Sequence, residues 1–345
     1  MIKIQNSNLE QIANEHYNLL CNIFNFSISK RLDASLAKYK IKRKDIYKKY
    51  VKLLQYLQDN LEDIIIGKPQ KLEYHKIKLI ELSKDFEFTK KDNKKTSEQK
   101  EILADLNKIF NYETFSSKGF KKDIKRENGK SEKLFYSGNV LVEKLGIWVC
   151  PYCNRNTIYN IKYGEQRTSE LDHFYPKSKY PYFALSFYNL IPSCKVCNKI
   201  KLDNDDKKYI NPYDDRFDMS KSVKFSLKIK SSNFYHLENG FNIEYKFSDK
   251  ISKDERDRIE NNLEDFALKD LYQNHKDIIL ELIQKEVVYN DSYLDELFKS
   301  YEGTLFKNRE DLQRLISGGF IDESEINKRP LSKLIKDISQ ELGLW

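Results

Sequence analysis

Four of the five cysteines form two Cys-x-x-Cys pairs near the middle of the chain. Cys150 and Cys153 make the first pair, Cys194 and Cys197 the second, and forty residues separate the pairs. The thiolates of each pair can face one centre, and together they complete the tetrahedron that structural zinc prefers. Four thiolates leave no position open for water. We therefore expect this zinc to hold the fold and to take no part in chemistry.

Two alternatives to a zinc site are a pair of unrelated motifs and a redox-active Cys-x-x-Cys. A redox pair normally lies beside a βαβ pattern, which this sequence lacks, so the spacing favours a metal. The fifth cysteine, Cys21, lies in an apolar helical stretch, and we expect it to be a small buried hydrophobic residue.

The segment between the cysteine pairs contains adjacent acid and base groups, Asp172 and His173. Asp172 and the amide oxygen of Asn198 could be ligands of a hard divalent ion. His173 is suited to removing a proton from water near pH 7. Since a divalent ion on a phosphodiester stabilises the charge of the transition state, this set indicates phosphodiester hydrolysis.

The elements around these residues must bring them together. Adjacent strand residues point to opposite faces, so either Asp172 or His173 must lie where a strand ends, and Pro176 favours a turn there. After Cys194 we expect a short helix, in which Asn198 and the later Lys201 share a face.

Basic residues near the expected ion could bind phosphate. Lys201 would lie beside the ligand Asn198, Lys177 and Arg155 are further candidates, and Lys199 would point elsewhere. From 150 to 201 the chain has eight basic and three acidic residues, so positive charge is concentrated there.

A single Asp-His pair often arises by chance, and a single histidine is usually structural. The position between two cysteine pairs argues against chance here. The other histidines are weaker candidates: His16 lies in an apolar stripe, and ligand-like neighbours are absent around His75, His236 and His275.

These motifs resemble the HNH nucleases of the ββα-metal fold. The resemblance covers about 145–205 and is closest in character to the zinc-bearing branch, similar to the PtuB nucleases of Septu antiphage systems and of some retrons. It is carried by Cys150-Pro151-Tyr152-Cys153-Asn154-Arg155, by Leu171-Asp172-His173-Phe174-Tyr175-Pro176-Lys177 and by Asn189-Leu190-Ile191-Pro192-Ser193-Cys194-Lys195-Val196-Cys197-Asn198.

The resemblance implies a role for each matching residue. His173 would be the general base, Asp172 a metal ligand, and Asn189 the residue that braces the loop bearing the histidine. Asn198 would occupy the last motif position, which gives an H-N-N version. An oxygen ligand there favours Mg²⁺ or Mn²⁺ over a softer ion. The family also implies a β-hairpin leading into a helix. Thr157–Tyr163 and Glu170–His173 fit its strands, with Gly164 in the turn.

The hydrophobic pattern predicts an α+β protein that is predominantly helical. We expect a helical region over 1–135, the nuclease core with its four-cysteine zinc over 136–215, and a β-hairpin plus helices over 216–345. Lys-rich stretches at 89–99 and 116–133 are predicted to be loops. Alternation within 221–248 predicts strands, with Asn239-Gly240 as a two-residue hairpin turn.

Composition adds little about function. The net charge of +8 permits an anionic partner, although the abundance of Lys, Asn, Ile and Tyr can also reflect an AT-rich genome. A signal peptide and an apolar run long enough for a membrane span are both missing from the sequence, so we expect a cytoplasmic protein.

Three functions remain open. The first is a metal-dependent endonuclease in antiphage defence or restriction, with DNA favoured over RNA. The second is a zinc-stapled module that binds nucleic acid without cutting it. Asp172, His173 and Asn198 favour the first, since a binding module needs no general base. The third is an effector subunit that is active only with a partner ATPase and whose substrates could include RNA or tRNA. The chain lacks a Walker-type glycine loop, so nucleotide hydrolysis would come from another chain.

Overall fold

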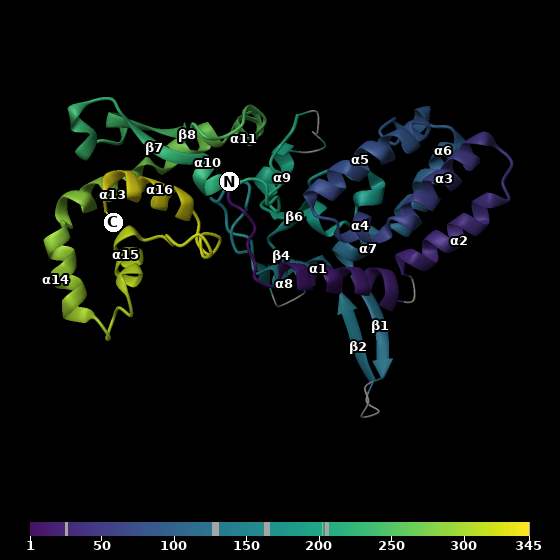
Figure 1. Cartoon of the computed structure of the whole chain (residues 1–345), viewed down its shortest axis with the longest axis horizontal. Coiled ribbons are helices and arrows are strands. Elements are labelled where there is room, and N and C mark those ends of the chain that lie inside the picture. The colour runs from purple at the N-terminus through teal and green to yellow at the C-terminus, as the bar shows by residue number, and fades with distance from the viewer. Residues whose placement is uncertain (25–26, 126–130, 162–165, 202, 204–206, 345) are drawn as a thin grey trace.

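The computed structural model describes residues 1–24, 27–125, 131–161, 166–201, 203 and 207–344. It is an α+β protein, mostly helical, with small antiparallel sheets, as predicted. The cysteine-rich segment lies in the middle of the molecule, between a helical lobe formed by about the first 117 residues and the C-terminal helices (Figure 1).

The N-terminal lobe is built from helices with one buried face. Leu54 and Leu57 of one helix and Ile64 of the next are buried in its core, and Asn60 separates the two helices. Asn60 ends the first of them, and both its backbone NH and its side-chain amide donate to the carbonyl of Tyr56. The helices are α1 (Leu9–Asn18), α2 (Ile28–Lys40), α3 (Asp45–Asp59), α4 (Leu61–Ile66), α5 (Pro69–Ser83), α6 (Ser97–Ile109) and α7 (Tyr112–Ser117).

The stretch 116–133, predicted to be a loop, contains most of a β-hairpin. Strand β1 (Phe120–Lys125) pairs antiparallel with β2 (Ser131–Tyr136), and the hairpin projects from the body of the molecule (Figure 1). Phe120 lies opposite Tyr136, and Leu134 packs against the same core. Lysines on the outward face of a ribbon do not prevent pairing, so composition alone gave a wrong prediction.

The other Lys-rich stretch, 89–99, is also predicted to be a loop. It is irregular apart from a short 3₁₀ turn before helix α6 begins at Ser97. Thr96 caps α6: its side chain accepts from the backbone NH of Gln99, and the Gln99 side chain accepts from the backbone NH of Thr96.

The central segment forms a strand–strand–helix unit, but with a different pairing from the one expected. Glu170–His173 (β5) pairs with Leu190–Ser193 (β6) rather than with a strand in 157–163. The apolar run of β6 is fully buried, so it completes the pair inside the core. The preceding hairpin is smaller, and Gly164 lies outside the described residues. The remaining elements here are α8 (Gly138–Leu145), β3 (Asn160–Ile161), β4 (Gln166–Arg167) and α9 (Lys195–Lys201).

The C-terminal region contains the predicted strands, β7 (Val223–Ile229) and β8 (Phe241–Phe247), in an antiparallel pair. The predicted two-residue turn at Asn239-Gly240 is wrong, because 230–240 connects the strands through two 3₁₀ turns. Gly240 is needed for another reason: a Cβ there would lie 2.6 Å from the Cα of Phe234. The helices are α10 (Met219–Ser222), α11 (Lys253–Asp265), α12 (Leu268–Tyr272), α13 (Lys276–Val288), α14 (Asp291–Tyr301), α15 (Arg309–Ser317) and α16 (Ser332–Leu342).

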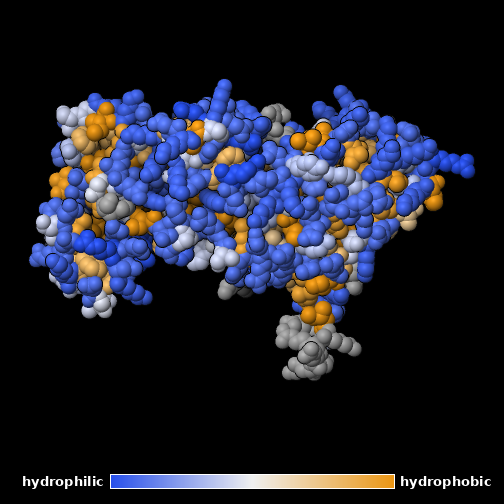
Figure 2. Space-filling view, in the orientation of Figure 1, coloured by the Kyte–Doolittle hydropathy of each residue, from blue (hydrophilic) through white to orange (hydrophobic). Residues whose placement is uncertain are grey.

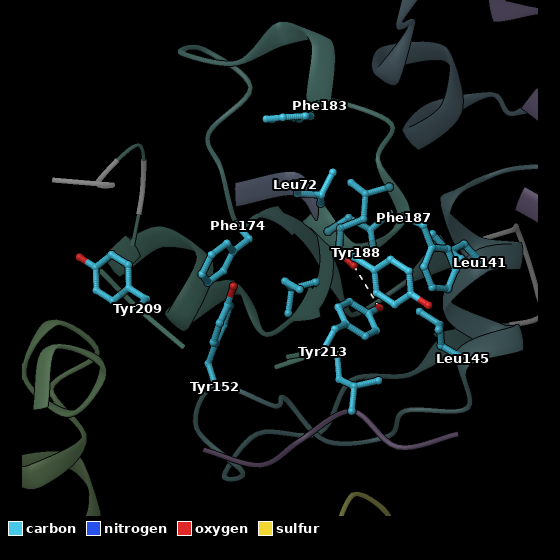
Figure 3. Packing of buried hydrophobic residues seen from close by; sticks show 14 of the residues in the cluster. Leu72, Leu141, Leu145, Tyr152, Phe174, Phe183, Phe187, Tyr188, Tyr209 and Tyr213 are labelled. Carbon is cyan, nitrogen blue, oxygen red and sulfur yellow. Dashed lines mark hydrogen bonds between the residues drawn. The ribbon is translucent and has the colours of Figure 1, made fainter. Parts of the chain in front are cut away.

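One hydrophobic core runs through all three regions expected from the sequence, and Cys21 is buried in it as predicted. The middle of this core is rich in aromatic rings, and Figure 3 shows Tyr188 packed near Tyr213 there, with ring centroids 5.3 Å apart. A smaller cluster joins α14 to α15 through Phe306, Leu312 and Ile316. The division into domains stays a prediction.

The surface in Figure 2 is mostly hydrophilic, with smaller apolar groups spread over it, one of them at the base of the projecting hairpin. None of the helices in the described ranges is long and apolar enough to cross a bilayer.

Candidate active site and metal centre

The four cysteines of the two pairs meet at one point. Their sulfur atoms all lie within 4.8 Å of one another, and all four residues are buried. In the described part of the chain, no other group of three or more His, Cys, Asp or Glu side chains lies this close together. The arrangement could bind a metal such as zinc, and the donor set of four thiols is the one expected for a closed structural site.

Hydrogen bonds to the sulfur atoms support a thiolate site. The Asn156 amide donates to the Sγ of Cys194 at 3.2 Å, and the backbone NH of Arg155 donates to the Sγ of Cys153 at 3.4 Å. The backbone NH of Cys197 also donates to Cys194, at 3.5 Å. Donors directed at sulfur stabilise its negative charge, as metal ligation requires.

The first cysteine pair is fixed to the C-terminal region by Asn154. This residue is fully buried and has a left-handed backbone, with φ of 48°. Its carbonyl accepts from the NH of Leu331 and its side-chain oxygen from the NH of Lys333, while its amide donates to Ile326. The turn that contains Cys150 and Cys153 therefore also anchors the start of α16.

Beside the cysteine cluster lies a cleft of about 410 Å³. Its walls come from β5, α9, the loop after β5 and the start of α7. The residues lining it are Tyr112, Ser116, Glu170, Leu171, Asp172, His173, Pro176, Lys177, Asn198, Lys199 and Asp203. The structure thus brings three predicted site residues, Asp172, His173 and Asn198, to one cavity.

His173 is the last residue of β5. At a strand end the strict alternation of side chains between the two faces no longer holds, so His173 and the adjacent Asp172 can both reach the cleft. Its Nε2 lies 3.0 Å from the carbonyl oxygen of Ala184, which can only accept, so Nε2 carries the proton and Nδ1 is the free base. The Tyr112 ring packs edge-on against it at 4.4 Å. Burial lowers the pKa of His173 to about 3, and it is therefore a neutral imidazole at pH 7.

Asn189 lies behind the cleft and is completely buried. Its oxygen accepts from the backbone NH of Tyr175 at 2.6 Å, and its amide donates to the carbonyls of Tyr175 and Phe183. It therefore ties together the two ends of the loop that follows His173. This is the geometry that the bracing role requires, and the role itself stays a prediction.

Asp172 is buried and paired. Its Oδ2 accepts from the Tyr152 hydroxyl at 2.6 Å and lies 3.1 Å from Nζ of Lys201, which lies 3.2 Å from Oδ1. The same ammonium group donates to the carbonyl of His173 at 2.7 Å. Both carboxylate oxygens of the expected metal ligand therefore have partners from the protein.

The residues predicted to bind phosphate differ in whether they are exposed and whether they line the cleft. Lys201 is buried against Asp172, whereas Lys199, expected to point elsewhere, is exposed and lines the cleft. Lys177 also lines it, above the Tyr112 ring. Arg155 is not part of the lining, and its Nε donates to His275 at 2.9 Å. The i, i+3 spacing of α9 alone could not show which partner Lys201 would meet.

Two residues of the cleft were not singled out by the motifs. Glu170 shares a strand face with Asp172, and its carboxylate accepts a hydrogen bond from the amide of Asn198. The two-residue period of the strand was a signal for it. Tyr112 comes from α7, far away in the sequence, and local spacing contains no signal for that contact.

Comparison with known proteins finds one segment of this chain that is similar to a curated protein. A stretch of 65 residues is 42% identical to the Septu protein PtuB of Bacillus thuringiensis. The stretch is 18% of this chain and covers 23% of that relative's length. No family model and no solved structure matches the chain. The segment relates this chain to that Septu protein over this stretch.

The side chains that line the cleft offer the kind of ligand atom that a hard divalent ion prefers. Glu170, Asp172 and Asn198 offer carboxylate and amide oxygens, which Mg²⁺ and Mn²⁺ prefer. The fit at Asp172 is incomplete, because a cation there must share the carboxylate with Lys201 or displace it.

Proposed function

We propose that this protein is a metal-dependent endonuclease of the HNH type that hydrolyses phosphodiester bonds in nucleic acid. The observation that carries the proposal is the cleft shared by Asp172, His173 and Asn198 beside the four-cysteine centre. The order β5–β6–α9, with the histidine ending the first strand and the asparagine on the helix, supports it.

In the proposed reaction, His173 takes a proton from the attacking water at Nδ1, while its Nε2–H stays bonded to Ala184. Lys177 and Lys199 bind the phosphate at the rim of the cleft. When bound, Mg²⁺ or Mn²⁺ would lower the pKa of water and neutralise charge on the phosphate. That contribution matters because an imidazole whose pKa is about 3 is a weak base.

The proposed substrate is DNA, in antiphage defence. The resemblance to PtuB in the matched segment supports the setting, and the basic segment 150–201 supports an anionic substrate. A partner ATPase fits the same setting, because the sequence has no Walker-type loop of its own.

The test is cleavage of supercoiled plasmid by the purified, zinc-loaded chain with Mg²⁺ or Mn²⁺. His173→Ala should lower the rate by at least about 100-fold, because a general base contributes that much. Its zinc content and circular dichroism should match the wild type. His236→Ala, at an exposed histidine outside the cleft, is the control and should cut normally.

Equal cutting by wild type and His173→Ala would reject the nuclease assignment. Plasmid binding without cutting under both metals would favour the second candidate, a zinc-stapled binding module.

A further inference from the structure

Helix α9 is fixed against β5 by two polar pairs. Glu170 meets Asn198, and Asp172 meets Lys201. Glu170 and Asp172 are two apart on the strand and so share a face, and Asn198 and Lys201 are three apart on the helix. The two pairs differ in exposure, because Lys201 and Asp172 are buried while Glu170 and Asn198 are half-buried on the cleft.

The hydrogen bond between Glu170 and Asn198 fixes the orientation of the Asn198 side-chain amide. A carboxamide has an oxygen that accepts and an NH₂ group that donates, and a hard cation binds only the oxygen. The NH₂ group of Asn198 donates to Oε2 of Glu170. The amide oxygen must then point to the other side of the group, away from Glu170.

Asp172 cannot replace Glu170 in this role. Its carboxylate already accepts from Tyr152 and contacts Lys201 through both oxygens. Among the acids that line the cleft, Asp203 accepts from the Ser178 hydroxyl at 2.6 Å. Glu170 is the cleft acid bonded to the Asn198 amide.

We propose that Glu170 is a positioning residue that sets the Asn198 amide with its oxygen toward the exchangeable metal ion. This inference rests on the proposed function, since it assigns a task within the same site. It differs from the roles implied by motif resemblance, because Glu170 acts through another residue and need not touch the ion.

The experiment measures Mn²⁺ affinity of the zinc-loaded full chain by electron paramagnetic resonance of free Mn²⁺, so activity is not needed. Glu170→Ala should raise the Kd by about 10- to 100-fold, the usual effect of losing an outer-shell partner of a metal ligand. Glu170→Gln keeps an oxygen acceptor at the same length and should stay within about threefold of wild type.

A double-mutant cycle asks whether Glu170 acts through Asn198. In an Asn198→Ala background, Glu170→Ala should add no further loss of affinity. The matched control is Glu244→Ala, at an exposed acid on strand β8 outside the cleft, which should leave the Kd unchanged. If Glu170→Ala loses zinc, Glu170→Val replaces it and keeps a residue suited to a strand.

Three results would overturn the inference: wild-type affinity in Glu170→Ala, a Glu170→Gln variant as weak as Glu170→Ala, or additive losses in the cycle. A wild-type chain that binds no Mn²⁺ would instead reject the proposed function, and the inference with it. The two failures are therefore distinguishable.

Discussion

At the residue scale, the buried ion pair of Asp172 and Lys201 neutralises the Asp172 carboxylate that lines the cleft. Each side chain is almost fully buried, and each compensates the charge of the other. Removing one partner of such a pair leaves an unpaired charge, which usually costs more than the pair contributes when intact. The i, i+3 spacing could be read from the sequence, but the partner of Lys201 depends on tertiary packing and could not.

Lys201→Met should lower the free energy of unfolding by about 3–5 kcal/mol, because it leaves the Asp172 carboxylate buried and unpaired. Adding Mn²⁺ should restore part of that loss, since a cation then contacts the same carboxylate. The measurement is urea unfolding of zinc-loaded protein with and without Mn²⁺. Lys199→Met, on the same helix but exposed, should change stability by less than about 0.5 kcal/mol. Equal stability of the two variants would contradict a structural role for the pair.

At the element scale, hydrogen bonds link the first cysteine pair to α16. Asn154 follows Cys153 directly and bonds to three residues between 326 and 333. The Tyr272 hydroxyl also donates to the carbonyl of Cys153 at 2.5 Å. The cysteine cluster is therefore linked to an element more than a hundred residues away in the sequence.

Cys197→Ser, or removal of zinc by a chelator, should speed amide hydrogen exchange in α16 by at least about tenfold, which corresponds to about 1.4 kcal/mol of local opening free energy. Cys197→Ser should also bind less zinc. Exchange in α3 serves as the internal control, because α3 lies in the N-terminal lobe (Figure 1) and should change little. A uniform increase across both helices would argue against this specific coupling.

Sequence patterns identified the helices and the β7–β8 strands well but failed at two pairings. The β1–β2 hairpin was hidden by lysines that face solvent, and β5 was assigned the wrong partner. The two errors differ in cause: β5 and β6 are joined by a loop that no local period spans, whereas the β1–β2 hairpin is local and was missed because of its lysines. The cysteine spacing, in contrast, predicted a contact across forty residues because metal chemistry demands it.

At the scale of the whole molecule, His16 joins three distant segments. It lies on α1, its Nδ1 accepts from the Tyr136 hydroxyl of β2 at 2.7 Å, and its Nε2 donates to the carbonyl of Leu185 at 2.8 Å. The sequence predicted a packed histidine, and it is fully buried. Its two hydrogen bonds could not be foreseen, because their partners are far away in the chain.

Burial lowers the pKa of His16 from 6.5 to about 4. Between these values the unfolded chain binds a proton that the native protein does not, so stability is complete above pH 6.5 and falls toward pH 4. This one histidine accounts for about 3 kcal/mol of that loss. His16→Gln should be less stable at pH 7 but show a flatter decline in urea unfolding across this range. His236→Gln, at an exposed site, should keep the wild-type slope, and an unchanged slope in His16→Gln would contradict the assignment.

The left-handed backbone at Asn154 also limits which sequences this fold can accept. Glycine would adopt the same φ but would lose both side-chain hydrogen bonds, and most other residues would resist the conformation. Aspartate would keep the acceptor for Lys333 and lose the donor to Ile326. The position therefore admits essentially one residue. In a collection of natural variants of this chain, we expect Asn154 to vary as little as the cysteine that precedes it.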